Sequence, residues 1–214
     1  MKLDLYLVTD AALCGERGVV ETVRQAVSGG VTIVQLRDKR GSAVEQLREL
    51  EQLAEAVDGR ADLVINDRLD VAVAARERGL RIGVHLGQGD DAVTRARAEL
   101  GPDAIVGLTA NTRAHREAVA LMEAGTVDYL GVGVIHPTAT KPDHPPALGV
   151  SGFREFAART ALPCVAIGGV QFADVAPLRT AGAAGIALVS ALCAAPHPAE
   201  AARMFLSEWQ EAAR

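Results

Sequence analysis

The sequence lacks any apolar run that approaches the roughly 18 residues needed to cross a bilayer. Its first ten residues, MKLDLYLVTD, contain two acids and no long apolar region of the kind that marks a signal peptide. Cysteine is scarce, with three residues at irregular spacing, and this odd count favours free thiols over a disulfide framework. We therefore expect a cytoplasmic protein that has no membrane partner.

An excess of positive charge is also missing. The 22 Lys and Arg residues are outnumbered by 27 Asp and Glu residues, and the net charge of −5 argues against a nucleic-acid partner. An anionic small-molecule substrate stays compatible with this charge because the local arrangement of side chains decides what binds. Apolar residues make up 49% of the 214 residues, enough for a sizeable core. No linker or change in composition divides the chain, so we expect one domain over residues 1–214.

Short runs rich in β-branched residues and leucine alternate with longer segments of helical period. Eight of these runs are predicted strands: residues 3–9, 31–37, 61–66, 82–87, 104–109, 127–133, 163–169 and 185–190. An open doubly wound sheet would also accommodate alternating strands and helices. The number of units and their even spacing, about 27 residues each, favour closure. The predicted fold class is therefore α/β, a single (β/α)8 TIM barrel.

Residues at the predicted helix ends support this pattern. Gly79 and Gly182 are among the glycines that separate a helix from the next strand, where a left-handed residue commonly ends a helix. Ser42 stands three residues before Glu45, which is the spacing of a capping box. Ser151 is likewise expected to precede a helix that begins near Gly152.

Polar side chains gather where the predicted strands end, which is where barrels of this class carry their chemistry. Because side chains alternate along a strand, Gln35 and Arg37 are expected to share the inner face with Val31 and Ile33. Lys39 follows beyond the strand. An amide, a guanidinium and an ammonium at one mouth suit a diphosphate. The competing interpretation is a solvated loop in which these groups pair with Asp38.

Two acids, Asp67 and Asp90, follow the third and fourth predicted strands. Hard oxygen ligands at adjacent strand ends suit Mg²⁺, which takes one or two protein carboxylates together with substrate phosphates. Each acid could instead cap the helix that follows it. We expect the metal for this pair and the helix cap for Asp91. His85 is expected to pack below the rim, since no second His or Cys lies at metal-ligand spacing.

A second group of residues suits a phosphate. Gly168 and Gly169 end the seventh predicted strand, and Val189 and Ser190 end the eighth, where barrels often bind a phosphate. Further hydroxyl and ammonium groups follow the fifth and sixth strands, namely Thr109, Thr138, Thr140 and Lys141. The last three lie in a proline-rich stretch, residues 136–149, that is predicted to be a loop. Provision for two anions indicates a reaction between two phosphorylated molecules.

The motifs VTIVQLRDK, INDR, GVHLGQGD, GLTANT, GVIHPTATK, AIGGV and LVSAL occur in an order that resembles the thiamine-phosphate synthase family. The resemblance extends from Tyr6 to the last predicted helix. It departs from the family pattern at three positions, with Thr109 in place of a common Ser, Val134 in place of a frequent Pro and His136 in place of a frequent aromatic residue. For His136 we expect a packing role.

The resemblance implies a role for each polar residue. Hydroxymethylpyrimidine diphosphate would be held through its diphosphate by Gln35, Arg37, Lys39, Asn66 and Lys141. Asp67 and Asp90 would bind Mg²⁺ as the cofactor, and Thr109 would contact the pyrimidine amino group or the diphosphate. The thiazole phosphate would be bound by Thr138, Thr140, Gly169, Val189 and Ser190.

The implied reaction is dissociative: pyrophosphate leaves first, and the thiazole nitrogen then captures the pyrimidinylmethyl cation. Arg37, Lys39, Lys141 and Thr109 would take part in this transferase step. Two alternatives stay open, a thiazole tautomerase of the same barrel family and a barrel that binds thiazole phosphate without catalysis. The first needs only one phosphate site. The sequence also leaves open whether the chain forms a homo-oligomer.

Overall fold

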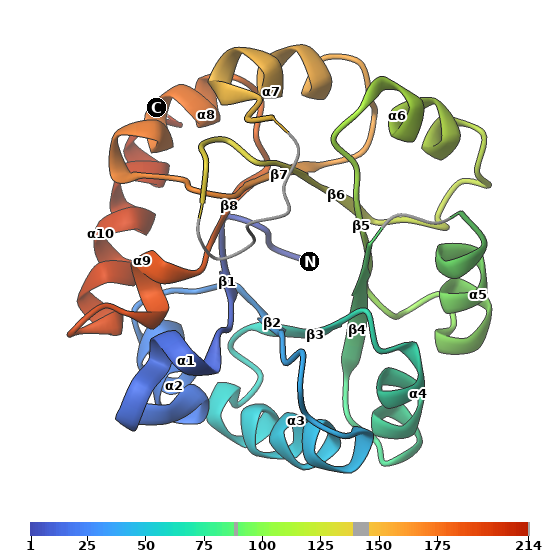
Figure 1. Ribbon diagram of the computed structural model, residues 1–214, viewed down its shortest axis with the longest axis vertical. Coiled ribbons are helices and arrows are strands. Elements are labelled where there is room, and N and C mark those ends of the chain that lie inside the picture. The colour runs from blue at the N-terminus through green and yellow to red at the C-terminus, as the bar shows by residue number, and fades with distance from the viewer. Residues whose placement is uncertain (88–89, 139–145, 214) are drawn as a thin grey trace.

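In the computed structural model, eight parallel strands form a closed barrel in the order β1 to β8 (Figure 1). The structure describes residues 1–87, 90–138 and 146–213, and for residues 90 and 91 only the backbone. The strands are β1 (Leu5–Val8), β2 (Ile33–Leu36), β3 (Asp62–Asn66), β4 (Ile82–Leu86), β5 (Val106–Thr109), β6 (Tyr129–Gly133), β7 (Cys164–Ile167) and β8 (Gly185–Leu188). Each lies within a predicted run, so the predicted (β/α)8 barrel is confirmed.

Helices surround the barrel and connect its strands (Figure 1). They are α1 (Ala11–Cys14), α2 (Gly18–Ser28), α3 (Ala43–Val57), α4 (Leu69–Glu77), α5 (Asp90–Leu100), α6 (Arg113–Ala120), α7 (Gly149–Ala157), α8 (Val175–Thr180), α9 (Ser190–Cys193) and α10 (Pro198–Glu211), with short 3-10 turns η1 (Gly15–Arg17) and η2 (Phe172–Asp174). No helix in the described part of the chain is both long and apolar enough to cross a bilayer.

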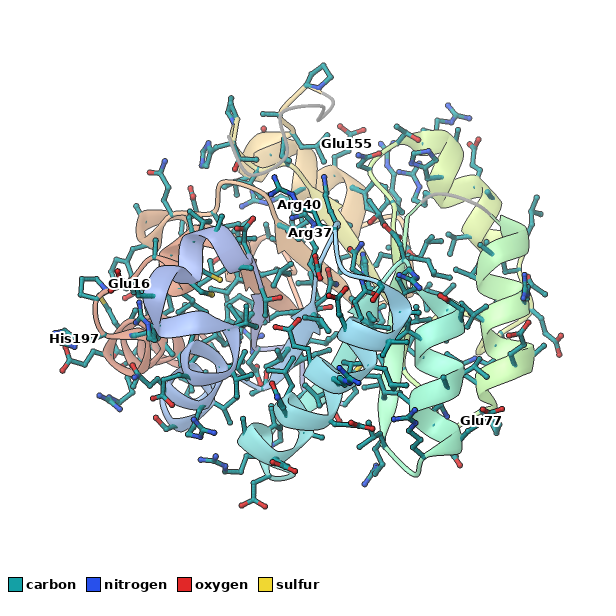
Figure 2. The ribbon with its side chains drawn as sticks, turned by 60° about the horizontal axis from the view of Figure 1, so that its bottom comes forward. Glu16, Arg37, Arg40, Glu77, Glu155 and His197 are labelled. Carbon is teal, nitrogen blue, oxygen red and sulfur yellow. The ribbon has the colours of Figure 1, made fainter. Side chains whose placement is uncertain are left out.

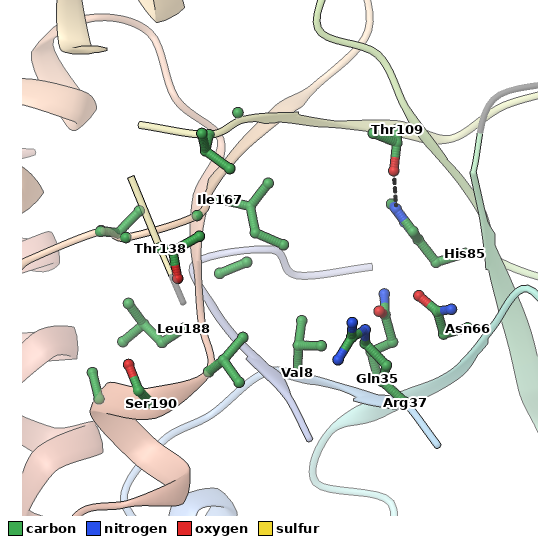
Figure 3. A pocket seen from close by; sticks show the side chains of 18 of the residues that line it. Val8, Gln35, Arg37, Asn66, His85, Thr109, Thr138, Ile167, Leu188 and Ser190 are labelled. Carbon is green, nitrogen blue, oxygen red and sulfur yellow. Dashed lines mark hydrogen bonds between the residues drawn. The ribbon is translucent and has the colours of Figure 1, made fainter. Parts of the chain in front are cut away.

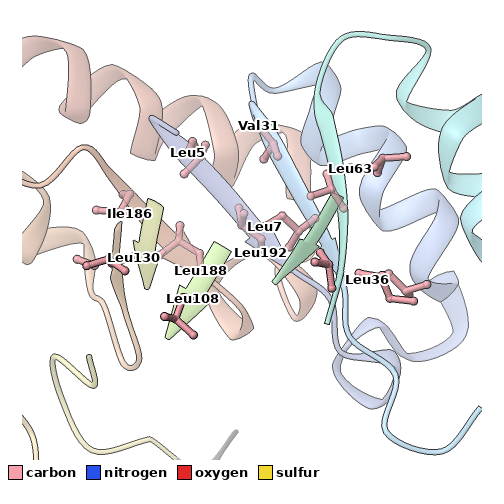
Figure 4. Packing of buried hydrophobic residues seen from close by; sticks show 14 of the residues in the cluster. Leu5, Leu7, Val31, Leu36, Leu63, Leu108, Leu130, Ile186, Leu188 and Leu192 are labelled. Carbon is pink, nitrogen blue, oxygen red and sulfur yellow. The ribbon is translucent and has the colours of Figure 1, made fainter. Parts of the chain in front are cut away.

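Alternation along each strand divides the apolar residues between two layers. Leu5 and Leu7 of β1 point outward and pack with residues of the helices in the outer core, part of which is drawn in Figure 4. Tyr6 and Val8 point inward and pack with residues such as Val64 inside the barrel. Because successive side chains of a strand face opposite sides, this single alternation builds both the shell and the filled interior.

Strand β2 follows the same rule. Ile33 and Gln35 face the interior, while Val34 and Leu36 belong to the outer core, as predicted. The expectation for Val31 is wrong, because it packs in the outer core. It lies two residues before β2 begins, where the strand alternation no longer applies.

Two predicted helix starts had different outcomes. Ser42 caps α3: its hydroxyl accepts a hydrogen bond from the Glu45 backbone N–H, and the Glu45 carboxylate accepts one from the Ser42 N–H. Ser151 caps nothing, since α7 already begins at Gly149 and Ser151 lies inside its first turn. Gly149 has a φ of 63°, so the chain turns into the helix at this residue, ahead of the serine.

We predict that Ser42→Ala lowers the free energy of unfolding by about 1 kcal/mol, the usual cost of losing a helix cap. The matched control is Ser151→Ala, an exposed serine within a helix, which should leave that free energy unchanged or slightly higher. Urea denaturation of both variants measures the difference. Equal losses in the two variants would show that the capping box of α3 contributes nothing.

Candidate active site

A pocket opens at the carboxyl ends of the strands, and every strand contributes to its wall. The residues that line it at these ends are Val8, Gln35, Asn66, His85, Thr109, Gly133, Ile167 and Leu188. Figure 2 shows Arg37 and Arg40 at this end of the barrel, with Glu77, at the carboxyl end of α4, toward the other end. The predicted convergence of the strand ends at one mouth is therefore present.

Arg37 lies just past β2 and lines the pocket. Its backbone N–H donates to the Thr9 hydroxyl at 3.0 Å, and its guanidinium lies 3.9 Å from the carboxylate of Asp10. The Arg37 side chain is 14% exposed, so it is largely withdrawn from solvent. The residues that follow β1 thus lie beside Arg37, whose positive charge borders the pocket. The alternative of a pair with Asp38 does not describe Arg37, because Asp38 accepts from the backbone of Arg40 and Gly41.

Asn66 and Asp67 join the ends of β3 and β4. The Asp67 carboxylate accepts from the Asn66 side-chain amide at 2.7 Å and from the Gly87 backbone N–H at 2.8 Å. Asp67 adopts a left-handed φ of 60°, which turns its exposed side chain toward the next strand end. The helix-cap interpretation of Asp67 is not supported, since α4 is preceded by Arg68 and has no side-chain cap.

The donor chemistry at Asp67 fits a magnesium ion. An exposed carboxylate at the rim supplies the hard oxygen that Mg²⁺ prefers, and one or two such carboxylates suffice when phosphates complete the coordination. Within the described residues, no group of three or more His, Cys, Asp or Glu side chains is placed to hold a metal. The second predicted ligand, the side chain of Asp90, lies outside the described part of the chain.

The pocket floor on this side carries His85 and Thr109. His85 is 7% exposed, and its Nε2 lies 3.0 Å from the Thr109 hydroxyl (Figure 3). Its Nδ1 lies 2.9 Å from the Tyr129 hydroxyl. As expected, His85 lies below the rim, and it is hydrogen-bonded there. Burial raises the pKa of Tyr129 well above its ordinary value, so this phenol stays protonated.

The opposite side of the pocket carries no charged side chain among the described lining residues. Gly168, Gly169, Val189 and Ser190 line it, together with Thr138. In Figure 3 the labelled Thr138 and Ser190 lie across the pocket from Gln35, Arg37 and Asn66. The two glycines have φ values of 89° and 68°, which side chains rarely adopt.

His136 secures the chain next to this side. Its Nε2 lies 2.9 Å and 3.0 Å from the two carboxylate oxygens of Asp174, at the end of η2. Its backbone N–H donates to the Gly168 carbonyl at 3.0 Å. His136 is not among the residues that line the pocket, and these contacts favour the expected packing role.

The structure therefore brings together eight of the predicted site residues around one pocket: Gln35, Arg37, Asn66, Thr109, Thr138, Gly169, Val189 and Ser190. Lys39 and Asp67 do not line the pocket and are exposed at its rim. Thr140 and Lys141 lie outside the described residues, as does the Asp90 side chain. The assignment of these residues to two anion-binding groups stays a prediction.

Sequence reasoning missed three residues that support the site. Asp10, which faces Arg37, directly follows the first predicted strand, so the rule used for the other strand ends would have found it. Tyr6 and Tyr129 gave no such signal, because a tyrosine within a strand is usual for a β former. They are the two tyrosines of the chain, and both are buried inside the barrel.

The closed barrel and a pocket with polar side chains at the carboxyl ends of its strands define a (β/α)8-barrel enzyme. Comparison with known proteins specifies which kind. The family profile described as thiamine monophosphate synthase matches residues 5–192. The chain belongs to this family, which confirms the resemblance and the prediction of a transferase that forms thiamine phosphate.

Individual relatives agree across nearly the full length. The thiamine-phosphate synthase of Psychrobacter sp. (strain PRwf-1) is 43% identical over 96% of this chain and 95% of its own. That of Azorhizobium caulinodans is 48% identical over 94% of this chain and 92% of its own. Among solved structures, thiamine phosphate pyrophosphorylase from Pyrococcus furiosus has a TM-score of 0.82 at 30% identity, covering 98% of this chain and 96% of that one.

The glycine geometry gives a testable consequence. A methyl group on Gly168 would lie 2.4 Å from the Val134 side chain, whereas one on Gly18, also at positive φ, would meet nothing within 4 Å. Gly168→Ala should therefore lower the free energy of unfolding by about 1–3 kcal/mol more than Gly18→Ala, since only the first adds overpacking to backbone strain. Urea denaturation compares them. Equal losses would mean that the contact with Val134 relaxes without cost.

Proposed function

We propose that the chain joins 4-amino-2-methyl-5-hydroxymethylpyrimidine diphosphate to hydroxyethylthiazole phosphate, or to its carboxylate, and releases pyrophosphate. The observation that carries this proposal is the division of one pocket into two sides. One side has Arg37, Asn66 and the nearby Asp67. The other has the two glycines after β7 and Ser190 after β8.

On the first side, Arg37 and Asn66 would bind the diphosphate, with Gln35 below them and Lys39 at the rim. A guanidinium can donate two parallel hydrogen bonds to phosphate oxygens, and the Asp10 carboxylate lies 3.9 Å from this one. Asp67 and Asp90 would hold Mg²⁺, which when bound neutralises negative charge on the leaving diphosphate. Lys141 is proposed to add a further positive charge from the loop after β6.

On the second side, the thiazole phosphate would bind to Gly169, Val189 and Ser190. Backbone N–H groups suit an anion because they carry partial positive charge without the bulk of a side chain. Thr138 lines the same side and offers a hydroxyl, and Thr140 is proposed to do so as well. This places the thiazole nitrogen across the pocket from the diphosphate.

The bond changes are a dissociative substitution. The bond between the pyrimidine methylene carbon and the diphosphate oxygen breaks, and its electron pair leaves with pyrophosphate. The thiazole nitrogen then donates its lone pair to the methylene carbon and forms the new C–N bond. Arg37 stabilises the charge that develops on the leaving group, and holding both reactants in one pocket supplies proximity.

The middle of the pocket suits a short-lived cation. Val8 and Ile167 lie between the two polar sides in Figure 3 and present apolar surface to the reacting carbon. Apolar walls offer no hydrogen bonds to an ordered water, which would otherwise trap the cation as an alcohol. Thr109 on the floor is proposed to contact the pyrimidine amino group or the diphosphate.

The two alternatives explain less of this geometry. A thiazole tautomerase or a barrel that only binds thiazole phosphate needs the second side alone. Neither would require the Arg37 guanidinium at the pocket wall, or the Asp67 carboxylate hydrogen-bonded to Gly87 after β4. The relatives described above are thiamine-phosphate synthases, which also supports the proposed reaction.

We further propose that residues 1–214 form one catalytic domain that works in the cytoplasm. All eight strands belong to one barrel, and α10 packs against α2 beside it. The three cysteines are buried free thiols, which suits a reducing compartment.

Replacing Arg37 tests the charge stabilisation directly. We predict that Arg37→Ala lowers kcat about 10²- to 10³-fold, by analogy with the loss of one donor to a developing oxyanion. The matched control is Arg40→Ala, which removes an exposed arginine that does not line the pocket and should keep nearly full activity. A steady-state assay of thiamine phosphate gives both values. Unchanged kinetics in Arg37→Ala would remove this residue from the mechanism.

Removal of divalent metal tests the role proposed for Asp67 and Asp90. With both substrates present, excess EDTA should abolish thiamine phosphate formation, and added Mg²⁺ should restore it, because the cationic side chains would supplement the double charge of the ion at the diphosphate without replacing it. The measurement is pyrophosphate release before and after chelation. A full rate in EDTA would contradict the metal assignment, while leaving the two-sided pocket in place.

A further inference from the structure

Beneath the pocket, five side chains form one continuous chain of hydrogen bonds across the barrel. The Gln35 amide nitrogen donates to the Tyr6 hydroxyl at 2.7 Å, and the Tyr6 and Tyr129 hydroxyls lie 2.8 Å apart. Tyr129 lies 2.9 Å from Nδ1 of His85, whose Nε2 lies 3.0 Å from the Thr109 hydroxyl. The chain links β2, β1, β6, β4 and β5, and only its two ends and His85 reach the pocket wall.

The strands make room for this chain. A methyl group on Gly107 of β5 would lie 2.3 Å from the Tyr129 ring, and one on Gly131 of β6 would lie 3.1 Å from the His85 ring. Glycine within a strand weakens it and often marks a close approach of other groups. Two glycines within adjacent strands therefore clear the space in which Tyr129 and His85 lie.

The direction of one bond determines the direction of all the others. If Gln35 donates to Tyr6, then Tyr6 donates to Tyr129, Tyr129 donates to Nδ1 of a neutral imidazole, and Nε2–H donates to the Thr109 oxygen. The amide oxygen of Gln35 is then left to accept, and the Thr109 hydroxyl is left to donate. Reversing the first bond reverses every bond, so with a neutral imidazole the two ends always differ in character.

Both phenols stay neutral throughout. Tyr6 and Tyr129 are 2% and 0% exposed, and burial raises the pKa of each above its ordinary value. A mismatch within the chain would leave a buried donor or acceptor unsatisfied, which is costly in such surroundings. The five hydrogen-bonded side chains therefore strongly prefer an arrangement in which all donors point the same way along the series.

The character of the two ends suits an aminopyrimidine. Such a ring carries an amino group that donates and ring nitrogens that accept, so it needs one acceptor and one donor from the protein. Gln35 is 3% exposed and lies two residues below Arg37 on β2, at the level of the floor. Its amide nitrogen donates to Tyr6, so the amide oxygen would be the atom that accepts from an amino group, and it would repel a phosphate oxygen.

We propose that Tyr6, Tyr129 and His85 are positioning residues that, through Gln35 and Thr109, present one acceptor and one donor to the pyrimidine ring. This rests on the proposed function, because it assumes that the ring occupies the first side of the pocket. It also refines the roles expected from the sequence: Gln35 serves the amino group of the ring, and Arg37 serves the diphosphate.

The test uses Tyr6→Phe, Tyr129→Phe and the double variant in the full-length enzyme. Each single change keeps the ring and removes the hydroxyl that continues the chain. Each hydroxyl takes part in two of these hydrogen bonds, so its loss leaves both neighbours without that partner. We expect kcat/KM for the pyrimidine diphosphate to fall about 10- to 30-fold in each single variant, the size of effect that an unsatisfied buried polar group produces. The double variant should fall by a similar factor rather than by their product, since one break already ends the chain.

Two readouts separate positioning from a general loss of structure. The KM for thiazole phosphate and the inhibition constant of added pyrophosphate should each stay within about twofold, because in this proposal neither ligand contacts Gln35 or Thr109. The matched control is Thr22→Val, which removes a buried hydroxyl of α2 that donates to the Gly18 carbonyl and does not line the pocket. It should lose stability and keep the wild-type kcat/KM.

Each outcome is decisive. Suppose that the wild-type enzyme is active. The positioning role is then overturned if the tyrosine variants keep the wild-type kcat/KM, or if their losses multiply in the double variant, while the proposed function stands. Equal losses for thiazole phosphate and pyrophosphate would also overturn it, in favour of a structural role. A wild-type chain that forms no thiamine phosphate overturns the proposed function and this assignment together.

Discussion

Pairing of β1 with β8 closes the sheet, and the position of every polar group in the site follows from this closure. Tyr6 pairs with Ile33 on one side and with Ala187 on the other, so β1 completes a ring of parallel strands. Parallel strands that alternate with helices all end at the same rim. Residues as distant in sequence as Arg37, Thr109 and Ser190 therefore line one pocket without any long connection.

The same closure gives the barrel an interior that must be filled. Most of it is apolar, with Val64 and Val165 among the packed residues. The top of the interior holds the polar chain from Gln35 to Thr109, which satisfies its buried groups internally. Rigid packing below and hydrogen bonds within the chain hold the pocket floor in one arrangement, so specificity for a ring can come from residues that do not touch it.

The sequence could predict the parts that depend on local period and on strand ends. Alternation correctly placed Gln35 inward and Leu36 outward, and the spacing of Ser42 and Glu45 correctly marked a helix start. Local patterns misplaced two residues at element boundaries. Val31 precedes the start of β2, and Ser151 follows the start of α7. Local patterns carry no information about such boundaries when a tight turn decides them.

Groups that meet only through the tertiary fold were beyond local reasoning. Tyr6 and Tyr129 are 123 positions apart, and only the barrel brings their hydroxyls within 2.8 Å. The pairing of Asp10 with Arg37 likewise depends on β1 lying beside β2. The roles of individual site residues came from the family resemblance, because a local pattern does not show which ligand a side chain binds.

The most direct measurement is a crystal structure of the protein with Mg²⁺, pyrophosphate and thiamine phosphate. We predict pyrophosphate against Arg37 and Asn66, with the metal between it and the carboxylates of Asp67 and Asp90. The phosphate of the product should lie on the backbone of Gly169 and Ser190. Ligands bound at the opposite end of the barrel, or pyrophosphate on the side of Ser190, would contradict the two-sided pocket from which the mechanism is derived.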